Sequence, residues 1–284
     1  EWANLGANGY YQISDTDIAK LEWWKSFKDP ILVKLIEQGL KSNHDISRAT
    51  SRILQAQETL NSVRVDKNPK LNTSITNRKS TSSEESGTGR TSTSVTTQFQ
   101  TSWELDLFGK FKRSAEAAEA NVQLEIATMN GVKIKLISTI VESYISFRAT
   151  TDEINLNHEA AGYLKSYVEL AELEAQAGVK SIEAVQIAKI RLANLETSIV
   201  EKKKRIKETL LAIDLLLGTN PGKTLVTLDQ STSSLKSPST IAISIPAETI
   251  LQRPDIQEAL QRLQVEAAKV GVAEAQRYPT FSFT

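Results

Sequence analysis

The sequence has little of several features that would narrow its function at once. Its 284 residues include no cysteine, which excludes disulfide bonds and thiol catalysis and disfavours a structural zinc site. Aromatic residues make up only 6% of the chain, so there is little material for one thick core. With 34 basic and 34 acidic residues the formal net charge is zero, and nothing argues for a nucleic-acid partner.

Long apolar runs are also missing. No stretch approaches the ~18 apolar residues that a membrane-spanning helix needs, so a membrane role would have to come from strands. The sequence begins Glu1-Trp2-Ala3, without an initiating methionine, a basic segment or an apolar leader. We therefore expect a mature or clipped form.

Catalytic signatures are absent as well. The sequence contains no phosphate-binding loop, no GxSxG and no HExxH. Its two histidines, His44 and His158, lie far apart and lack a partner at metal-binding spacing. We predict no catalytic, cofactor-binding or metal-binding residue, and therefore no enzyme.

Apolar residues at helical spacing dominate what is present. Asp29-Pro30 predicts a helix start, with an aspartate cap followed by proline, and Asp45 can cap a second helix that ends near Val65. A much longer helix is predicted from Lys112 to about Gln176, with 150–152 as a possible interruption.

A second helix of this pair is predicted from about Ile182 to Leu217, ending at the stop signal 218–222. The two form an antiparallel hairpin of unequal arms with Gly178 near its tip. The following Ser/Thr/Pro-rich residues, 223–245, are interpreted as a linker.

Between the early helices and the long one, the period changes from helical to two. Alternation first appears at 71–76 and returns more clearly at 95–105, with a polar stretch between. This predicts a β-hairpin. One face carries Val95, Phe99 and Trp103, and the other carries Thr96, Gln98, Gln100 and Glu104.

The last segment resembles the early one at an offset of 210 residues. Asp45, Ile46, Ala49, Arg52 and Pro69 match Asp255, Ile256, Ala259, Arg262 and Pro279. In both copies a helix that starts at Asp-Ile is followed by proline and then by alternation. We expect one repeat and the opening of a second, truncated one.

The alternation alone permits two interpretations. A membrane strand and a half-buried soluble strand alternate alike, so a helical protein with a small β-hairpin arm stays open. In a bilayer, unpaired strand edges are not tolerated, and a single hairpin could close a barrel only with further copies.

Five segments resemble the outer-membrane efflux protein family, the TolC-like outer-membrane factors, closest to the branch that serves resistance-nodulation-division pumps. In chain order they are Trp23-Trp24-Lys25-Ser26-Phe27-Lys28-Asp29-Pro30, Asn43-His44-Asp45-Ile46, Trp103-Glu104-Leu105-Asp106-Leu107-Phe108-Gly109-Lys110, Arg253-Pro254-Asp255-Ile256 and Val270-Gly271-Val272-Ala273-Glu274-Ala275 before Tyr278-Pro279. Together they extend over nearly the whole chain.

The resemblance implies a mainly α fold with a transmembrane β-hairpin. Each repeat would supply a long antiparallel α-hairpin and two strands, and a homotrimer would close a twelve-stranded β-barrel continued by an α-barrel. Thr96, Gln98, Gln100 and Glu104 would face the lumen, while Val95, Phe99 and Trp103 would face outer-membrane lipid. The division implied is 1–68 for the periplasmic start, 69–109 for the barrel hairpin, 110–222 for the helical hairpin, 223–245 for an equatorial linker and 246–284 for the second repeat.

The resemblance also implies partners. The tip of the helical hairpin, at Gly178, Val179 and Ser181, would contact a periplasmic adaptor protein, and an inner-membrane pump would supply the energy. The family tip pattern, GxxSxxDV, is met by Gly178, Ser181 and Val185, but Ala184 replaces the aspartate. The expected function is passive conduction across periplasm and outer membrane; the alternative is a soluble helical-hairpin adaptor or scaffold.

Overall fold

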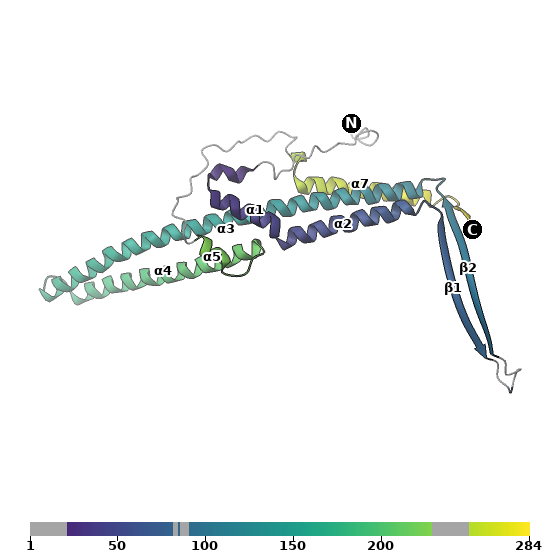
Figure 1. Cartoon of the computed structure of the whole chain (residues 1–284). Helices are drawn as coiled ribbons and strands as arrows, with labels where there is room; N and C mark the ends of the chain where they lie inside the picture. Colours follow the sequence, from purple (N-terminus) through teal and green to yellow (C-terminus); the bar gives the residue numbers. More distant parts are fainter. Residues whose placement is uncertain (1–21, 82–84, 86–90, 229–249) are drawn as a thin grey trace. The chain divides into compact units, whose positions relative to one another are not determined.

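The computed structural model describes residues 22–81, 85, 91–228 and 250–284. It is mainly helical with one small antiparallel sheet (Figure 1). In chain order the elements are η3 (Trp23–Phe27), α1 (Pro30–Ser42), α2 (His44–Val65), β1 (Lys70–Thr81), β2 (Thr91–Leu105), α3 (Lys110–Gln176), α4 (Ile182–Leu216), α5 (Lys223–Leu228), α7 (Pro254–Ala275) and β3 (Phe281–Phe283).

The described residues fall into two compact units, each considered by itself. The helical unit contains residues up to Arg48 and residues 129–228. The sheet unit contains 49–128, without the undescribed hairpin loop, and 250–284. The chain passes from one unit to the other within α2, after Arg48, and again within α3, after Thr128.

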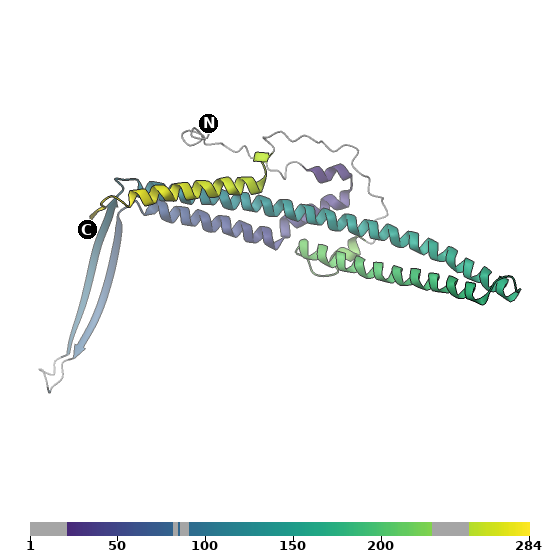
Figure 2. The ribbon, with the colours of Figure 1, turned by 180° about the vertical axis from the view of Figure 1, so that it is seen from behind.

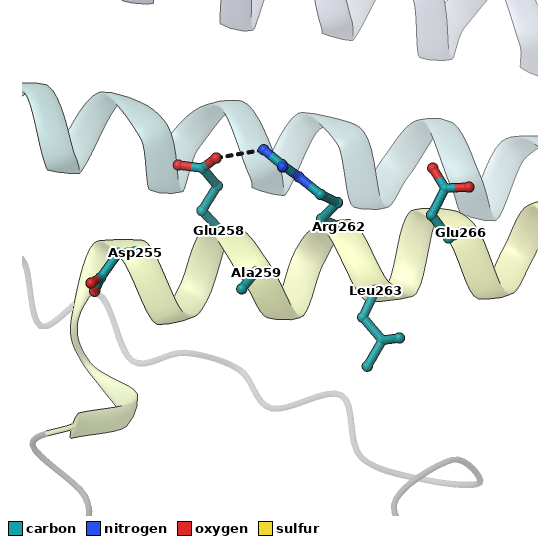
Figure 3. Close-up of a pocket in the computed structure, with 6 residues that line it drawn as sticks. All are labelled: Asp255, Glu258, Ala259, Arg262, Leu263 and Glu266. Atoms are coloured by element: carbon teal, nitrogen blue, oxygen red, sulfur yellow. Dashed lines mark hydrogen bonds and ion pairs between the residues drawn. The ribbon is translucent and has the colours of Figure 1, made fainter.

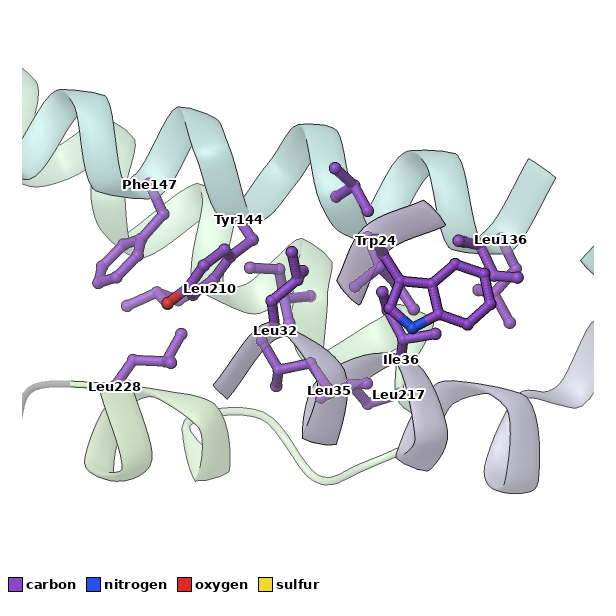
Figure 4. Close-up of a cluster of buried hydrophobic side chains, with 14 residues drawn as sticks. Trp24, Leu32, Leu35, Ile36, Leu136, Tyr144, Phe147, Leu210, Leu217 and Leu228 are labelled. Atoms are coloured by element: carbon purple, nitrogen blue, oxygen red, sulfur yellow. The ribbon is translucent and has the colours of Figure 1, made fainter. Parts of the chain in front are cut away.

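The helical unit holds the main core (Figure 4). Large apolar side chains from η3, α1, α3, α4 and α5 meet there, among them Trp24, Leu32, Ile36, Ile140 and Ile213. Burying a side chain of this size contributes roughly 1.5–3 kcal/mol, so this cluster is the main apolar stabilisation of the unit.

Asp29 joins the start of α1 to α3. One carboxylate oxygen, Oδ1, accepts the backbone N–H groups of Ile31 at 2.8 Å and Leu32 at 3.2 Å, which confirms the predicted cap. The other, Oδ2, accepts the hydroxyl of buried Tyr144 at 2.7 Å. The carboxylate is therefore fully used although it lies inside the protein.

Two glycines allow close contacts in the helical unit. A Cβ atom at Gly39 of α1 would lie 2.6 Å from Cδ1 of Ile140. At Gly218, which follows α4 with φ +61°, it would lie 2.4 Å from the carbonyl oxygen of Ser42. At Gly39, α1 therefore lies directly against a side chain of α3, and at Gly218 the backbone after α4 lies directly against the backbone at the end of α1.

α3 and α4 run antiparallel and lie side by side in both views (Figures 1 and 2). Lys202 pairs with Glu153, and Lys189 pairs with Glu172 at 2.7 Å, so two ion pairs connect the helices. The interruption considered at 150–152 does not occur, because α3 continues through these residues. Thr150 and Thr151 donate their hydroxyls to the carbonyls of Ser146 and Phe147, as helical threonines do.

α2 begins differently from the prediction. Its cap is Asn43, whose Oδ1 accepts the N–H groups of Asp45 at 2.8 Å and Ile46 at 3.2 Å, so Asp45 is not the cap. The amide of Asn43 also donates to the carbonyl of Leu216 at 2.9 Å. Asn43 carries out both tasks because its side chain holds an acceptor and a donor, whereas aspartate has acceptors alone.

In the sheet unit, α2 packs its apolar stripe against the start of α3. Ala56 and Leu60 contact Val122, with Ala118 and Ile126 beside them. The strands that follow form the predicted hairpin, and β3 adds to β2 as a third strand in the order β1-β2-β3.

The helices α2 and α7 support the internal repeat. His44 and Pro254, where they begin, and Val65 and Ala275, where they end, are both 210 residues apart. A strand follows each of them. The buried faces differ, since α2 buries Ala49 and Ile53 whereas the matching Ala259 and Leu263 are exposed.

Of the predicted linker, 229–245 lies outside the described residues. The described part of it is partly regular, since Lys223–Leu228 form the short helix α5. Asp214, in the last turn of α4 and only 1% exposed, holds this segment. Its Oδ1 accepts the N–H of Thr224 at 2.9 Å and the Thr224 hydroxyl, and its Oδ2 accepts the N–H of Gly222 at 2.7 Å.

These bonds set the charge state of Asp214. Burial by itself would raise its pKa, but the hydrogen bonds from Thr224, Gly222 and Thr219 stabilise the anion and leave the pKa lowered. A lowered pKa in the folded state contributes stability above the unfolded pKa, and this contribution is lost as the pH falls through the folded value.

We expect Asp214→Asn to lower the free energy of unfolding of the helical unit by about 2 kcal/mol at pH 7, because charge-assisted hydrogen bonds are lost. Urea unfolding of the two proteins at pH 7 and at stepwise lower pH measures it. The difference in unfolding free energy between the parent and the variant should shrink as the pH falls below the ordinary aspartate pKa. A difference that stays constant with pH would contradict the charged state proposed for Asp214. Asp152→Asn, on the surface of α3, serves as the control.

Candidate functional site

The pairing of β1 with β2 gathers the apolar side chains of both strands on one face, where threonines and one asparagine lie between them. Thr73 lies opposite Phe99, Ile75 opposite Thr97 and Asn77 opposite Val95. Since directly paired residues share a face, the predicted residues Val95, Phe99 and Trp103 do lie on one face. Leu71 and Ile75 of β1 belong to the same face, and so does Phe283 of β3, which pairs with Trp103.

No described element covers this apolar sheet face, made of Leu71, Ile75, Val95, Phe99 and Trp103. Ile75 is 72% exposed and Phe99 is 70% exposed. A sheet in water buries its apolar face against a core, and leaving it open forgoes roughly 25 cal/mol for each Å². The face therefore requires an apolar surrounding that the described chain does not provide.

The opposite face is polar throughout. Thr96 pairs with Thr76, Gln98 with Ser74 and Gln100 with Asn72, so every described cross-strand pair here joins side chains that bond water. Glu104 lies on this face near the end of β2 and forms an ion pair with Lys110 at 2.9 Å. The residues predicted to line water thus share one face, as the alternation indicated.

The end of β2 is tied firmly to the helices of the sheet unit. The indole N–H of Trp103 donates to the carbonyl of Lys67 at 3.0 Å. Asp106 accepts the N–H groups of Phe111 at 3.1 Å and Lys112 at 3.0 Å, and thereby caps α3. Gly109, with φ +76°, makes the turn between them.

The tip between α3 and α4 is built around Gly178. Its φ is +75°, its N–H donates to Ala175, and the N–H of Val179 donates to the carbonyl of Glu174 at 2.8 Å. This is a Schellman ending, which needs the left-handed conformation that glycine adopts at low cost. Ser181 then caps α4, because its hydroxyl oxygen accepts the N–H of Ala184 at 3.3 Å.

The surface of the tip is more apolar than charged. Val179 is 73% exposed, and Ile182 beside it is equally open. Lys180 is engaged locally, since it pairs with Glu174 at 2.5 Å and lies over the ring of Tyr167. The hydrogen bond that Lys180 donates to the carboxylate of Glu174 raises the pKa of Lys180, which keeps it charged.

Other candidate sites do not hold. A hollow on α7 is lined by Asp255, Glu258, Ala259, Arg262, Leu263 and Glu266 (Figure 3). All six come from one helix and Glu258 already pairs with Arg262 at 2.7 Å, so it is a helix surface and not a cleft. Within the described ranges, no three side chains of histidine, aspartate or glutamate group as metal ligands would.

The model of one protein family matches residues 35–219, and its description is outer membrane efflux protein. The chain belongs to this family. The matched region holds both predicted functional parts, the β-hairpin and the tip. The family consists of efflux channels and not of enzymes, and it places the chain at the outer membrane. Among the described residues, no helix is both long and apolar enough to cross a bilayer.

Curated relatives agree with the family. The chain is 27% identical over 275 residues to nodulation protein T of Rhizobium leguminosarum bv. trifolii, covering 95% of the chain and 58% of that protein. It is 27% identical over 291 residues to the toluene efflux pump outer membrane protein TtgF of Pseudomonas putida, covering all of the chain and 59% of TtgF.

A third curated relative is the cation efflux system protein CusC of Escherichia coli K12. It is 27% identical over 286 residues, covering 99% of the chain and 60% of CusC. The chain thus spans a little over half the length of these curated relatives.

A solved structure, the outer-membrane channel OprN, has the same fold. It superposes with a TM-score of 0.81 at 29% identity, covering 92% of the chain and 59% of OprN. The Campylobacter jejuni CmeC outer membrane channel, at 24% identity and a TM-score of 0.75, supports the fold alone.

We expect Ser181→Ala to destabilise the first turn of α4 by about 1 kcal/mol, because the cap of Ala184 is lost. Amide hydrogen exchange should become faster around 182–186. Ser166→Ala, on the exposed surface of α3, is the matched control and should leave exchange at the tip unchanged. Equal exchange in both variants would show that Ser181 is not the cap in solution.

Proposed function

We propose that this chain is part of an outer-membrane channel subunit of a tripartite efflux pump, which conducts exported substrates passively across periplasm and outer membrane. The observation that carries the proposal is the apolar sheet face. Membership of the outer membrane efflux protein family suggests what surrounds this face. The hydrocarbon interior of a membrane covers apolar side chains without a protein partner. The comparisons favour this function over a soluble helical adaptor.

The edges of the sheet support an assembly. The described sheet ends at β1, whose outer edge has no partner strand, and a bilayer does not tolerate such an edge. Closure requires strands from other copies. We propose a homotrimer in which each protomer supplies four strands to a twelve-stranded barrel, with α3 and α4 contributing to a helical barrel.

The two sheet faces then have separate tasks. Val95, Phe99 and Trp103 face lipid, and Trp103, near the end of β2, suits the interface between hydrocarbon and water. Thr96, Gln98, Gln100 and Glu104 face the lumen, where their amides, hydroxyl and carboxylate keep the duct wet. The duct makes and breaks no bond, so the energy comes from a partner pump in the inner membrane.

The tip at Gly178, Val179 and Ser181 is proposed as the contact for a periplasmic adaptor. Two well-defined caps hold the turn, and Val179 stands open to a partner. Because Ala184 replaces the acidic residue of the family pattern, the contact depends on apolar packing more than on a carboxylate. The matching bounds of α2 and α7 support the proposal that 246–284 opens a second repeat.

The proposal is tested by placing one charge on either face of β2. Phe99→Asp should sharply reduce the yield of trimer recovered from outer membranes, because a carboxylate on the lipid face must leave water. The cost stays below the roughly 2–4 kcal/mol of a midplane lysine or arginine.

Gln98→Asp is the matched control, one residue away on the same strand, and should assemble almost normally because it faces water. Trimer yield is measured by cross-linking in purified outer membranes of cells that make the full-length protein. Equal yields from the two variants would contradict the assignment of the faces.

A further inference from the structure

A groove of about 650 Å³ lies where the sheet of the sheet unit meets its helices. One side comes from the start of α3 and the turn before it, with Phe108, Lys112 and Arg113. The other side comes from the end of α7 and the residues after it, with Gly271, Arg277 and Tyr278. Unlike the hollow on α7, this groove joins segments far apart in the sequence.

The apolar part of the groove is a stacked aromatic pair. The rings of Phe108 and Tyr278 lie 4.6 Å apart with an angle of only 12° between them. Phe108 lies three residues after the end of β2, and Tyr278 lies three residues before the start of β3. Trp103 and Phe283, whose rings lie 6.3 Å apart, follow at the base of the apolar sheet face.

The polar part is mainly cationic. Lys112, Arg113 and Arg277 line it, with one carboxylate, Glu274. Arg113 pairs with Glu116 at 2.6 Å, and Asp106 is already bound to the first turn of α3. Lys112 and Arg277 have no carboxylate at ion-pair distance within the described ranges, so two cations remain available to an anion.

Gly271 shapes the groove. A Cβ atom there would lie 2.9 Å from Cδ and 3.0 Å from Cγ of Arg113, so the arginine stem rests directly on the backbone of α7. The aliphatic stem therefore forms part of the groove wall. Its guanidinium group pairs with Glu116, so Lys112 and Arg277 are the two other cations that line the groove.

We propose that this groove binds the phosphate headgroup of an anionic phospholipid. The lipid would lie in the periplasmic leaflet of the outer membrane, so the groove would be a lipid-binding site at the membrane boundary. Lys112 and Arg277 would bind the phosphate, and the Phe108–Tyr278 pair would contact the glycerol and the first acyl carbons. Aromatic and basic side chains combine in this way where hydrocarbon meets water.

The inference rests on the proposed function, since it requires the sheet to lie in the membrane. Free phosphate would satisfy the cations equally, but it would leave the aromatic wall without a role. Phe108 and Tyr278 each lie three residues from the end of a strand that carries the apolar sheet face. This nearness along the chain favours a lipid, whose acyl chains can extend toward that face.

The test is a lipid titration of the full-length protein, purified in detergent and observed by native mass spectrometry. Phosphatidylglycerol should bind with an affinity that falls roughly 25-fold in Lys112→Gln/Arg277→Gln, because each of the two basic residues contributes roughly fivefold at a membrane surface. The control, Lys203→Gln/Lys207→Gln, removes two exposed charges from α4 and should bind as the parent does. Phosphatidylcholine, which has no net charge, should bind more weakly and respond little to either change.

Equal phosphatidylglycerol affinity in the groove variant and the control would overturn the inference. Displacement of the lipid by millimolar inorganic phosphate would identify a free-anion site and overturn it too. If the double variant does not assemble, Arg277→Gln alone is titrated, since that side chain is exposed. Recovery of the parent protein in the soluble fraction would instead contradict the proposed function. A failure of the proposed function can thus be told apart from a failure of the lipid-binding inference alone.

Discussion

The apolar sheet face is the constraint on which the interpretation of this molecule depends. β1 and β2 place their apolar side chains together, and no described helix turns toward them. The helices themselves satisfy their own backbone and bury their stripes in two clusters. The sheet alone leaves both an apolar surface and an open edge, so its surroundings, and not its own contacts, decide whether it is stable.

Local chemistry made much of the fold predictable. Asp29-Pro30 marks a helix start, Gly178 and Gly218 end helices through a left-handed residue, and alternation over 95–105 orders the faces of β2. Each of these signals works within a few residues, where backbone geometry leaves few options. The grouping of Val95, Phe99 and Trp103 followed from the period of two by the same reasoning.

Contacts between distant residues could not be predicted in this way. Asn43 replaces Asp45 as the cap because it also reaches Leu216, which lies far along the chain. Asp214 appears as one more polar residue in a helix, yet it organises the segment up to Thr224. The pairing of β3 with β2 and the stacking of Phe108 on Tyr278 depend on how α7 lies along α3. Such contacts are set by tertiary packing, for which one sequence carries no periodic signal.

The two close contacts at Gly39 and Gly218 have a further consequence. At Gly39 a larger residue would meet the side chain of Ile140, so this position of α1 lies against α3 only while glycine occupies it. A shift of α1 along its axis would drive the carbonyl of Ser42 away from its place beside Gly218. The two contacts lie at different points along α1 and involve both α3 and the end of α4, so together they restrict movement of α1 along its axis relative to these helices.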